Sequence, residues 1–309
     1  MDTSTDRKYM KVKLLHTVSD GKFQETDWEK PKPTDDEIEV KAVMTGVCRS
    51  DIDMMVAKFG PLPIHMSGHE GLGQVTKIGK NIFNIKVGDF VATRGEPAYA
   101  DYYNVRSQEY VQVPEAHPRY IIEPVACGIN VVDQAWHEIK QRSQGKVLIL
   151  GSGFLAWVAF HRLTTYSAGT KIAQIDVLGS SNLDLWGDKL LIGTNESYDI
   201  VIDLSGKYTL GIDINLNNNA LIIDGVGKAI SHEESQQQLW KACTTVRPSP
   251  RTDGFYQCMK NAAWMIKAGH LDVDNFWTRA YNRSTEWQQA FADGLDRPSD
   301  YSRGYIKWD

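Results

Sequence analysis

The chain has 309 residues and a mass of 34.8 kDa, which is enough for two domains with separate hydrophobic cores. Its net charge of -5 and the lack of a lysine- or arginine-rich stripe give no electrostatic basis for binding nucleic acid. The apolar runs, such as residues 147–150, have the length of strands and are too short to span a membrane.

The cysteine content and the first residues bear on the location of the protein in the cell. Residues 1–8 contain no apolar stretch, so no signal peptide is expected. The four cysteines, at positions 48, 127, 243 and 258, are too widely scattered to form the framework of a disulfide-rich protein. We therefore expect a reducing, cytoplasmic environment.

The first hundred or so residues are predicted to be rich in β-structure. Residues 38–44 alternate between apolar and polar side chains, as a half-buried strand does. Residues 73–78 and 89–92 are further short strands, and a turn at 79–81 follows the first of them. Short strands at this spacing predict a compact, barrel-like domain.

After residue 123 the pattern changes to alternating helices and strands. Helices are predicted at 129–144 and 155–165, and strands at 146–150, 171–177, 198–203 and 220–224. This order is typical of βαβ units and predicts an α/β fold with a parallel sheet. Two helices follow, one capped at 252–253 and one with a capping box at 285–288, and 305–308 are predicted to form a closing strand.

Three separated segments carry side chains that bind zinc well. Cys48 follows an apolar strand, His69 and Glu70 lie in a glycine-rich segment, and Glu123 precedes a predicted helix. Thiolate, imidazole and carboxylate are the usual protein ligands of Zn²⁺, and a catalytic site leaves one position open. Taken singly, such a cysteine is more often a small buried hydrophobe, and a His-Glu pair more often lies on the surface. His65 is a possible rival ligand.

A glycine loop follows the strand at 146–150 and opens a helix. Gly151 allows a tight turn, Gly153 allows backbone to approach a pyrophosphate, and Ala156 allows the helix to pack closely on the sheet. Backbone N–H groups of Phe154 and Leu155 would face the phosphates. The alternative is a structural turn that binds no ligand.

The residues after the next strand bear on the choice of cofactor. Asp176, which we expect at the end of that strand, would accept hydrogen bonds from both ribose hydroxyls and favour NAD. The alternative is a solvated acid at a strand end. Residues 179–182 could instead hold a 2′-phosphate, so NADP stays open.

The ordered motifs resemble those of the medium-chain dehydrogenase/reductase family, in particular its zinc-containing alcohol and polyol dehydrogenases. The matching segments are residues 48–51, 68–71, 87–92, 123–128 and the loop at Gly151. Glutamate at 123 is similar to the polyol branch, whereas the alcohol branch has cysteine there. The resemblance covers nearly the whole chain, although residues 187–227 are too divergent to match.

The resemblance implies a GroES-like catalytic domain at 1–122 and 256–309, with a shortened Rossmann domain at 123–255 between them. It implies zinc ligation by Cys48, His69 and Glu70, with Glu123 as a fourth ligand or a neighbour that exchanges with water. Ser50 would lie on the proton relay, with Asp53 at its solvent end. Because residues 94–103 leave no room for the family's four-cysteine lobe, one zinc per chain is expected.

Two further departures from the family concern the Rossmann domain. Residues 186–199 leave little room for a full helix between its third and fourth strands, and Asp176 falls about one residue later than the family's ribose acid. The second departure weakens the argument for NAD.

The predicted function is therefore zinc-dependent hydride transfer between a polar alcohol, polyol or sugar-like substrate, or the matching carbonyl, and NAD or NADP. The carboxylates of Glu70 and Glu123 would add negative charge around the ion. The alternatives are a zinc-free quinone or enone reductase of the same fold and a non-catalytic nucleotide-binding protein. We expect a homo-oligomer, dimeric or tetrameric as in the family, and no nucleic-acid or membrane partner.

Overall fold

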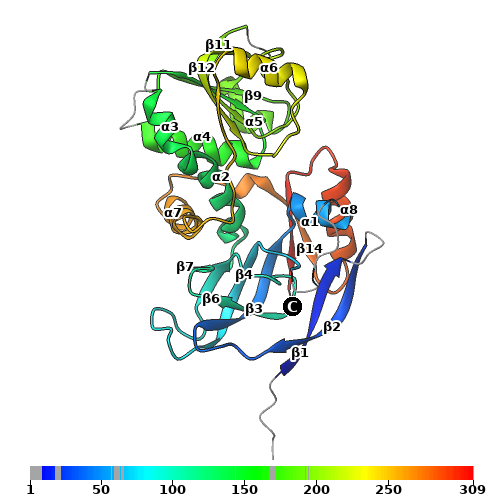
Figure 1. Cartoon of the computed structure of the whole chain (residues 1–309). Coiled ribbons are helices and arrows are strands. Elements are labelled where there is room, and N and C mark those ends of the chain that lie inside the picture. The colour runs from blue at the N-terminus through cyan, green and yellow to red at the C-terminus, as the bar shows by residue number, and fades with distance from the viewer. Residues whose placement is uncertain are drawn as a thin grey trace, which may run out of the picture. The chain divides into compact units, whose positions relative to one another are not determined.

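A computed structural model describes residues 9–17, 22–56, 58, 63, 66–142, 144–167, 172–191, 193 and 195–308. The chain divides into two compact units, one made of Met1–Pro124 with Met259–Asp309 and the other of Val125–Cys258. Figure 1 shows this division by colour, because blue and red strands share the first unit while green and yellow elements make the second.

The first unit is built on a seven-stranded sheet in the order β14-β15-β3-β4-β5-β7, with β6 paired to β3. Alternate side chains of β3, at Ile38, Val40 and Ala42, enter its core. β1 and β2 form a separate antiparallel pair. The strands are β1 (Tyr9–Thr17), β2 (Phe23–Pro31), β3 (Glu37–Gly46), β4 (Gly71–Ile78), β5 (Phe90–Thr93), β6 (Tyr102–Arg106), β7 (Tyr110–Val113), β14 (Trp277–Asn282) and β15 (Arg303–Lys307).

Two short α-helices of the first unit pack against each other, α1 (Arg49–Met55) and α8 (Trp287–Asp296). Gly294 permits this contact, since a Cβ there would lie 3.0 Å from the Cδ1 atom of Ile52. Single 3₁₀ turns occur at η1 (Pro118–Tyr120) and η3 (Asp274–Phe276). The packing of α8 fixes α1, which carries several of the candidate site residues.

The second unit is a parallel sheet in the order β10-β9-β8-β11-β12-β13. The strands are β8 (Lys146–Leu150), β9 (Gln174–Leu178), β10 (Leu190–Leu191), β11 (Ser197–Asp203), β12 (Asn215–Asp224) and β13 (Thr244–Val246). Strand order reverses between β8 and β11. In open α/β sheets, ligands bind at the carboxyl ends of the strands beside such a reversal.

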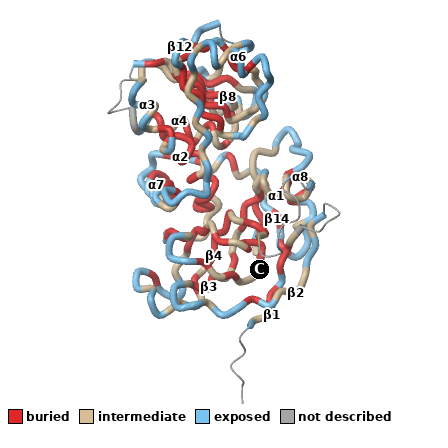
Figure 2. Tube along the Cα trace, viewed as in Figure 1, coloured by how far each residue is buried: buried red, intermediate tan, exposed pale blue. Residues whose placement is uncertain are grey.

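Apolar cores lie on both faces of this sheet, and Figure 2 shows buried positions along β8, α2 and α4. One core includes Val147, Ile149 and Ala159, and the other includes Leu148 and Val201. The helices are α2 (Glu123–Gln134), α3 (Trp136–Gln141), α4 (Phe154–Ser167), α5 (Leu183–Trp186), η2 (Gly187–Lys189), α6 (His232–Trp240) and α7 (Phe255–Lys267). The first residues of α2 and the last of α7 belong to the other unit.

The predicted strands all appear, with ends shifted by a few residues, but some helices differ from prediction. The helix expected at 129–144 is wrong, because α2 begins at residue 123, ends at 134, and is followed by the separate helix α3. Residues 186–199 were predicted to leave little room for a full helix. In the described part of 192–196, between β10 and β11, no helix is present. The capping box at 285–288 is not formed, since α8 begins at Trp287 without a side-chain cap.

No helix in the described parts of the chain combines the length and the apolar character that crossing a membrane requires.

Candidate functional site

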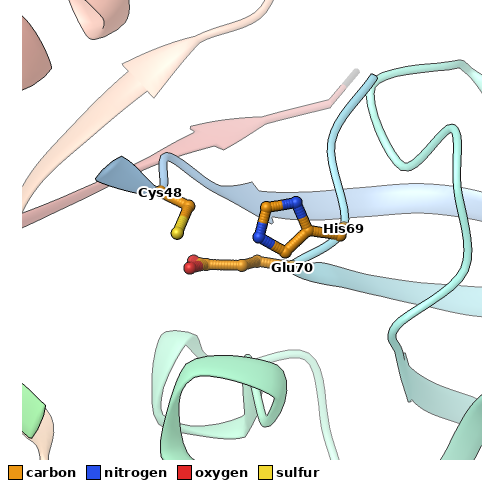
Figure 3. A group of neighbouring side chains, drawn as sticks. All are labelled: Cys48, His69 and Glu70. Carbon is orange, nitrogen blue, oxygen red and sulfur yellow. The ribbon is translucent and has the colours of Figure 1, made fainter. Parts of the chain in front are cut away.

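Cys48, His69 and Glu70 come together at the junction of β3 and β4. Their ligand atoms all lie within 4.8 Å of one another (Figure 3). Cys48 follows β3 as the N-cap of α1, while His69 and Glu70 lead directly into β4. The two strands are antiparallel neighbours, and Gly46 N donates to Glu70 O at 2.9 Å. Sheet register therefore brings together residues that are distant in sequence.

Two glycines allow the cluster to be this compact. A Cβ on Gly46 would lie 2.1 Å from Oε2 of Glu70, so any other residue there would displace the carboxylate. Gly68 precedes His69 with φ of +76°, a left-handed conformation that favours glycine. Glycines at these positions thus have a direct role in placing the three side chains of the cluster.

Arg303, the first residue of β15, binds the carboxylate of Glu70. Its Nη2 atom lies 2.6 Å from Oε1 and also contacts Oε2. Glu70 is fully buried, and the Arg303 guanidinium also lies over the Trp277 ring at 4.9 Å from its centroid. A buried carboxylate needs such a partner. The guanidinium of Arg303 therefore balances the negative charge of Glu70 within the cluster.

The imidazole of His69 faces a carboxylate on one side and a hydroxyl on the other. Nδ1 lies 3.8 Å from Oδ1 of Asp51, and Nε2 lies 3.3 Å from Oγ of Ser50. Burial lowers the pKa of His69, but the negative charges of Glu123, Cys48 and Asp51 outweigh burial and raise it well above its ordinary value. The site therefore attracts positive charge.

Asp51 is a site residue that the sequence analysis missed. It is fully buried, and its Oδ2 accepts hydrogen bonds from Cys48 N at 2.9 Å and from the Tyr99 hydroxyl at 2.8 Å. A metal-binding histidine commonly donates its second ring N–H to such a carboxylate. A capping-box reading of residues 48–51 could have found Asp51, because it is the N3 residue of α1.

The donor set fits a divalent cation. The pKa of the Cys48 thiol is raised by burial and by the negative charge of Glu70. A divalent ion at the sulfur would favour the thiolate and neutralise the nearby carboxylates. Among the described residues, this is the group of cysteine, histidine and acidic side chains close enough to share an ion.

Glu123 and Asp53 are placed differently from these three residues. Glu123 begins α2 and is 3% exposed, and although it is not part of the 4.8 Å cluster its charge acts on His69. Asp53 forms ion pairs with Arg49 Nε at 3.2 Å and Lys58 Nζ at 2.6 Å. The Asp53 carboxylate is therefore engaged with two cations in this structure.

In the second unit, the glycine loop lies at the reversal of strand order. Gly151 has φ of +110°, and its N–H donates to Leu178 O at the end of β9. Leu204, just after β11, donates to Leu150 O at 2.9 Å. Apart from Gly153 itself and its chain neighbours, no atom of the described residues lies within 4 Å of a Cβ built on Gly153, and α4 begins at Phe154. This arrangement leaves space at the helix start for a phosphate group.

The helix after this loop packs closely on the sheet. Ala156 is 1% exposed in the core that α4 forms with β8, as its small side chain predicted, and Leu155 precedes it in the first turn of the helix.

The expectation that Asp176 ends its strand is wrong. β9 continues to Leu178, and Asp176 lies in the middle of the strand beside Leu148. Its Oδ2 accepts hydrogen bonds from the Tyr198 hydroxyl at 2.9 Å and from Gln174 at 2.7 Å. The side chain points into the same core as Tyr198, because alternate residues of a strand face opposite sides. A role in binding ribose has no support from this position.

The segment that follows β9 is bound to the glycine loop instead. Ser152 Oγ donates to Ser181 O at 2.6 Å and accepts from Ser181 N at 2.8 Å. Asn182 and Trp186 both donate to Ser152 O. Residues 179–182, the alternative site for a 2′-phosphate, therefore lie directly beside the loop.

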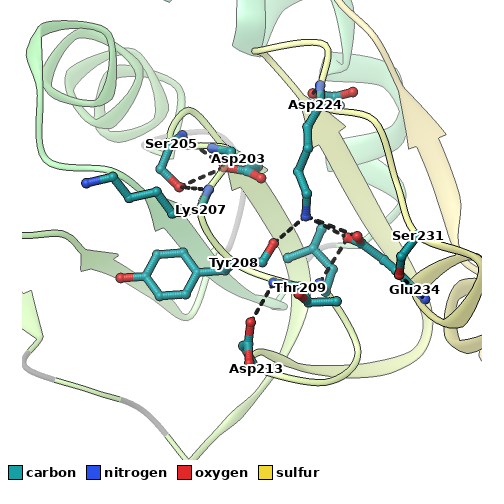
Figure 4. A network of polar contacts seen from close by, with 12 residues as sticks. Asp203, Ser205, Lys207, Tyr208, Thr209, Asp213, Asp224, Ser231 and Glu234 are labelled. Carbon is teal, nitrogen blue, oxygen red and sulfur yellow. Dashed lines mark hydrogen bonds and ion pairs between the residues drawn. The ribbon is translucent and has the colours of Figure 1, made fainter.

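Paired charges organise the loops after β11 and β12 (Figure 4). Oδ1 of Asp203 accepts hydrogen bonds from Ser205 N and Gly206 N, and Lys228 forms an ion pair with Glu234 at 3.0 Å. Beside them lies a cavity of about 370 Å³, lined in part by Asp224 and Arg247, which are themselves paired. Since its cations are already neutralised, phosphate groups are expected at the glycine loop rather than here.

Comparisons with known proteins agree with this architecture. Residues 34–119 match the alcohol dehydrogenase GroES-like domain family. D-arabitol-phosphate dehydrogenase of Enterococcus avium is 28% identical over 162 residues, covering 41% of this chain and 45% of that protein. NADP-dependent alcohol dehydrogenase 6 of Saccharomyces cerevisiae is 24% identical over 278 residues, covering 69% and 74%. The chain thus spans less than half the length of the first of these relatives.

Acetophenone reductase from Geotrichum candidum in complex with NAD has a similar fold, with a TM-score of 0.75 and 14% identity. The likeness covers 98% of each chain. The predicted fold class, a GroES-like domain together with a Rossmann parallel sheet, is confirmed.

Proposed function

Since the segment 34–119 of this chain belongs to the alcohol dehydrogenase GroES-like domain family and the whole chain has a medium-chain dehydrogenase fold, we propose that it is a zinc-dependent dehydrogenase. It would transfer hydride between an alcohol, polyol or sugar-like substrate, or the matching carbonyl, and a nicotinamide cofactor. The observation that carries this proposal is the cluster of Cys48, His69 and Glu70 at the start of β4.

Zinc is the ion that the donor set supports. A thiolate and an imidazole are soft or borderline ligands that favour Zn²⁺ over Mg²⁺ or Ca²⁺. Cys48 and His69 would be ligands, and Glu70 and Glu123 would supply the remaining negative charge. A bound zinc ion polarises a substrate oxygen and lowers the pKa of its hydroxyl.

The residues around the cluster would handle the proton. Ser50, whose hydroxyl lies beside His69 Nε2, is the group we propose to relay the substrate proton, taking it up on its oxygen while its own hydroxyl proton passes on toward solvent. Asp53 lies one turn further along α1 and would take part at the solvent end only if its ion pairs with Arg49 and Lys58 opened. The carboxylate of Asp51 would orient the imidazole of His69 through its Nδ1 atom.

The cofactor would be NAD or NADP, with its pyrophosphate at residues Gly151–Ala156. Support comes from the space at Gly153 and from the position of the loop at the strand-order reversal. The preference for NAD over NADP rested on Asp176 binding the ribose hydroxyls. This preference is weaker because the Asp176 carboxylate already accepts hydrogen bonds from Tyr198 and Gln174. One relative has NADP in its name, and one structural neighbour is a complex with NAD. Both cofactors are therefore to be tested.

The proposed substrate class stays that of alcohols, polyols and sugar-like compounds. Two cations near the cluster are already paired, because Arg303 binds Glu70 and Arg49 binds Asp53. Polyol phosphates are included in the test because D-arabitol-phosphate dehydrogenase is a relative with such a name.

The test is metal analysis of protein purified without chelator, followed by a panel of simple alcohols, polyols and polyol phosphates with each cofactor. We expect about one zinc per chain and turnover of at least one alcohol or polyol of the panel. Full activity in metal-free protein would favour a zinc-free quinone or enone reductase. Absence of turnover together with cofactor binding, followed by tryptophan fluorescence, would favour a nucleotide-binding protein.

Two further properties stay proposals. We propose that the protein is cytoplasmic, a location with which four free cysteines are compatible. We also propose a homo-oligomer, dimeric or tetrameric, which light scattering at two protein concentrations would test.

A further inference from the structure

Tyr99 has a hydroxyl group that its packing alone does not explain. The residue is fully buried, and its ring lies edge-on to Phe23 and Phe291, with centroids 5.9 and 5.3 Å away. A phenylalanine would fill the same space. A buried hydroxyl is costly unless it is hydrogen-bonded, so the polar contacts of this group identify its role.

The hydroxyl of Tyr99 donates its hydrogen bond to a residue of the candidate site. It lies 2.8 Å from Oδ2 of Asp51 and 3.0 Å from the Gly46 carbonyl oxygen. A hydroxyl has one proton, and the charged carboxylate is the stronger acceptor of the two. Tyr99 is therefore primarily a partner of Asp51.

The two carboxylate oxygens of Asp51 make different contacts. Oδ2 is held by two donors, Cys48 N and the Tyr99 hydroxyl. Oδ1 has no hydrogen-bond partner among the residues that the structure describes, and it lies 3.8 Å from Nδ1 of His69. With one oxygen held by two donors, the carboxylate cannot rotate freely, and its other oxygen stays directed at the imidazole.

We propose that Tyr99 is a positioning residue for the metal site, acting through Asp51 to fix the orientation and tautomer of His69. A proton held on Nδ1 by Asp51 leaves Nε2 available as a ligand, which is the arrangement that second-sphere carboxylates impose. This inference rests on the proposed function, since it requires that His69 binds an ion.

The experiment compares Tyr99→Phe with a matched control, Tyr103→Phe. Tyr103 is also fully buried in the same unit, and its hydroxyl bonds to Thr93 Oγ1 at 2.9 Å instead of to the cluster. Each full-length protein is stripped with chelator and titrated with Co²⁺, following the visible absorption of the cobalt–thiolate chromophore. Zn²⁺ affinity is then obtained by competition.

We expect Tyr99→Phe to weaken Co²⁺ affinity about fivefold to tenfold, at the lower end of the effects of second-sphere changes. It should also change the visible spectrum, whereas Tyr103→Phe should stay within about twofold of wild type with an unchanged spectrum. In an Asp51→Asn background, Tyr99→Phe should have little further effect, because Tyr99 acts through Asp51. Equal affinities and spectra for wild type and Tyr99→Phe would overturn the inference.

A second measurement covers the case in which Tyr99→Phe fails to fold. 3,5-Difluorotyrosine at position 99 keeps the ring and makes the hydroxyl a stronger donor, so the cobalt spectrum should change while it stays the same for the same replacement at Tyr103. If wild-type protein binds neither Co²⁺ nor Zn²⁺, the proposed function itself fails. If wild type binds normally and neither change at Tyr99 matters, only the role of Tyr99 is lost.

Discussion

Arg303 and Glu70 form a buried ion pair between residues 233 positions apart in the chain. The pair joins the first residue of β15 to the residue that precedes β4, and it places a permanent cation beside the candidate metal cluster. A metal ion that used Glu70 would compete with this guanidinium. Glu70 is therefore as important for the stability of the site as for its chemistry.

Glu70→Gln is expected to lower the free energy of unfolding by about 3 kcal/mol, because it leaves the buried Arg303 without its anionic partner. In chelator-treated protein, the double variant Glu70→Gln with Arg303→Gln should lose clearly less than the sum of the two single losses. Urea unfolding measures both values. Asp300→Asn, which breaks the exposed pair with Arg279, is the control and should have almost no effect. Additive losses would show that the pair is not coupled.

Cys48→Ser should remove most of the bound zinc and the dehydrogenase activity together. A serine hydroxyl is a much poorer zinc ligand than a thiolate, so we expect the zinc content and kcat/KM to fall at least about tenfold. Cys243→Ser, a change in the other unit, is the control. Metal analysis and a cofactor-absorbance assay give the two readouts. Loss of zinc with retained activity would contradict a catalytic role for the ion.

Metal affinity should rise with pH. The pKa of His69 lies well above its ordinary value of 6.5 and that of Cys48 lies above 9.0, so an entering ion must displace protons from both groups. Cobalt titrations between about pH 6 and 9 should therefore show affinity increasing toward alkaline pH. Affinity that is independent of pH would mean that neither group loses a proton when the metal binds.

The stability of metal-free protein should change in the opposite direction. Since the pKa of His69 is raised in the folded state, the bound proton stabilises the fold fully below pH 6.5. That contribution is lost as the pH rises through the folded-state value. The raised pKa of Cys48 has the same sign, because the folded protein disfavours the thiolate. Melting temperatures of chelator-treated protein should fall with rising pH, and added zinc should reverse the fall.

Asp176→Asn should leave the ratio of kcat/KM values for NAD and NADP within about twofold of wild type. The carboxylate lies in the middle of β9 and binds Tyr198 and Gln174, so it is turned away from the end of the strand. A clear shift toward NADP would restore Asp176 as a ribose-binding residue. Ser180, beyond the end of β9, offers a comparison, because Ser180→Asp should repel a 2′-phosphate and reduce the use of NADP.

The sequence predicted the fold well because its signals are local. The alternation in β3, the apolar run of β8 and the glycine loop each specify an element by themselves. The proximity of Cys48 to His69 followed from family motifs and was reproduced by the register of β3 and β4.

The misses have physical reasons. Asp176 was expected at a strand end, but β9 continues to Leu178, and the carboxylate of Asp176 is bound by Tyr198 and Gln174. Arg303 and Tyr99 lie far from the motifs in sequence, and only the paired strands of the first unit bring them to the site. No local pattern marks such contacts.

The position of β15 beside β3 affects the order in which the protein can be completed on the ribosome. Arg303, whose guanidinium neutralises Glu70, is synthesised 233 positions after that carboxylate. Before β15 exists, Glu70 lacks this partner. Zinc loading with the ion pair in place is therefore expected only after β15 has been synthesised and has paired with β3.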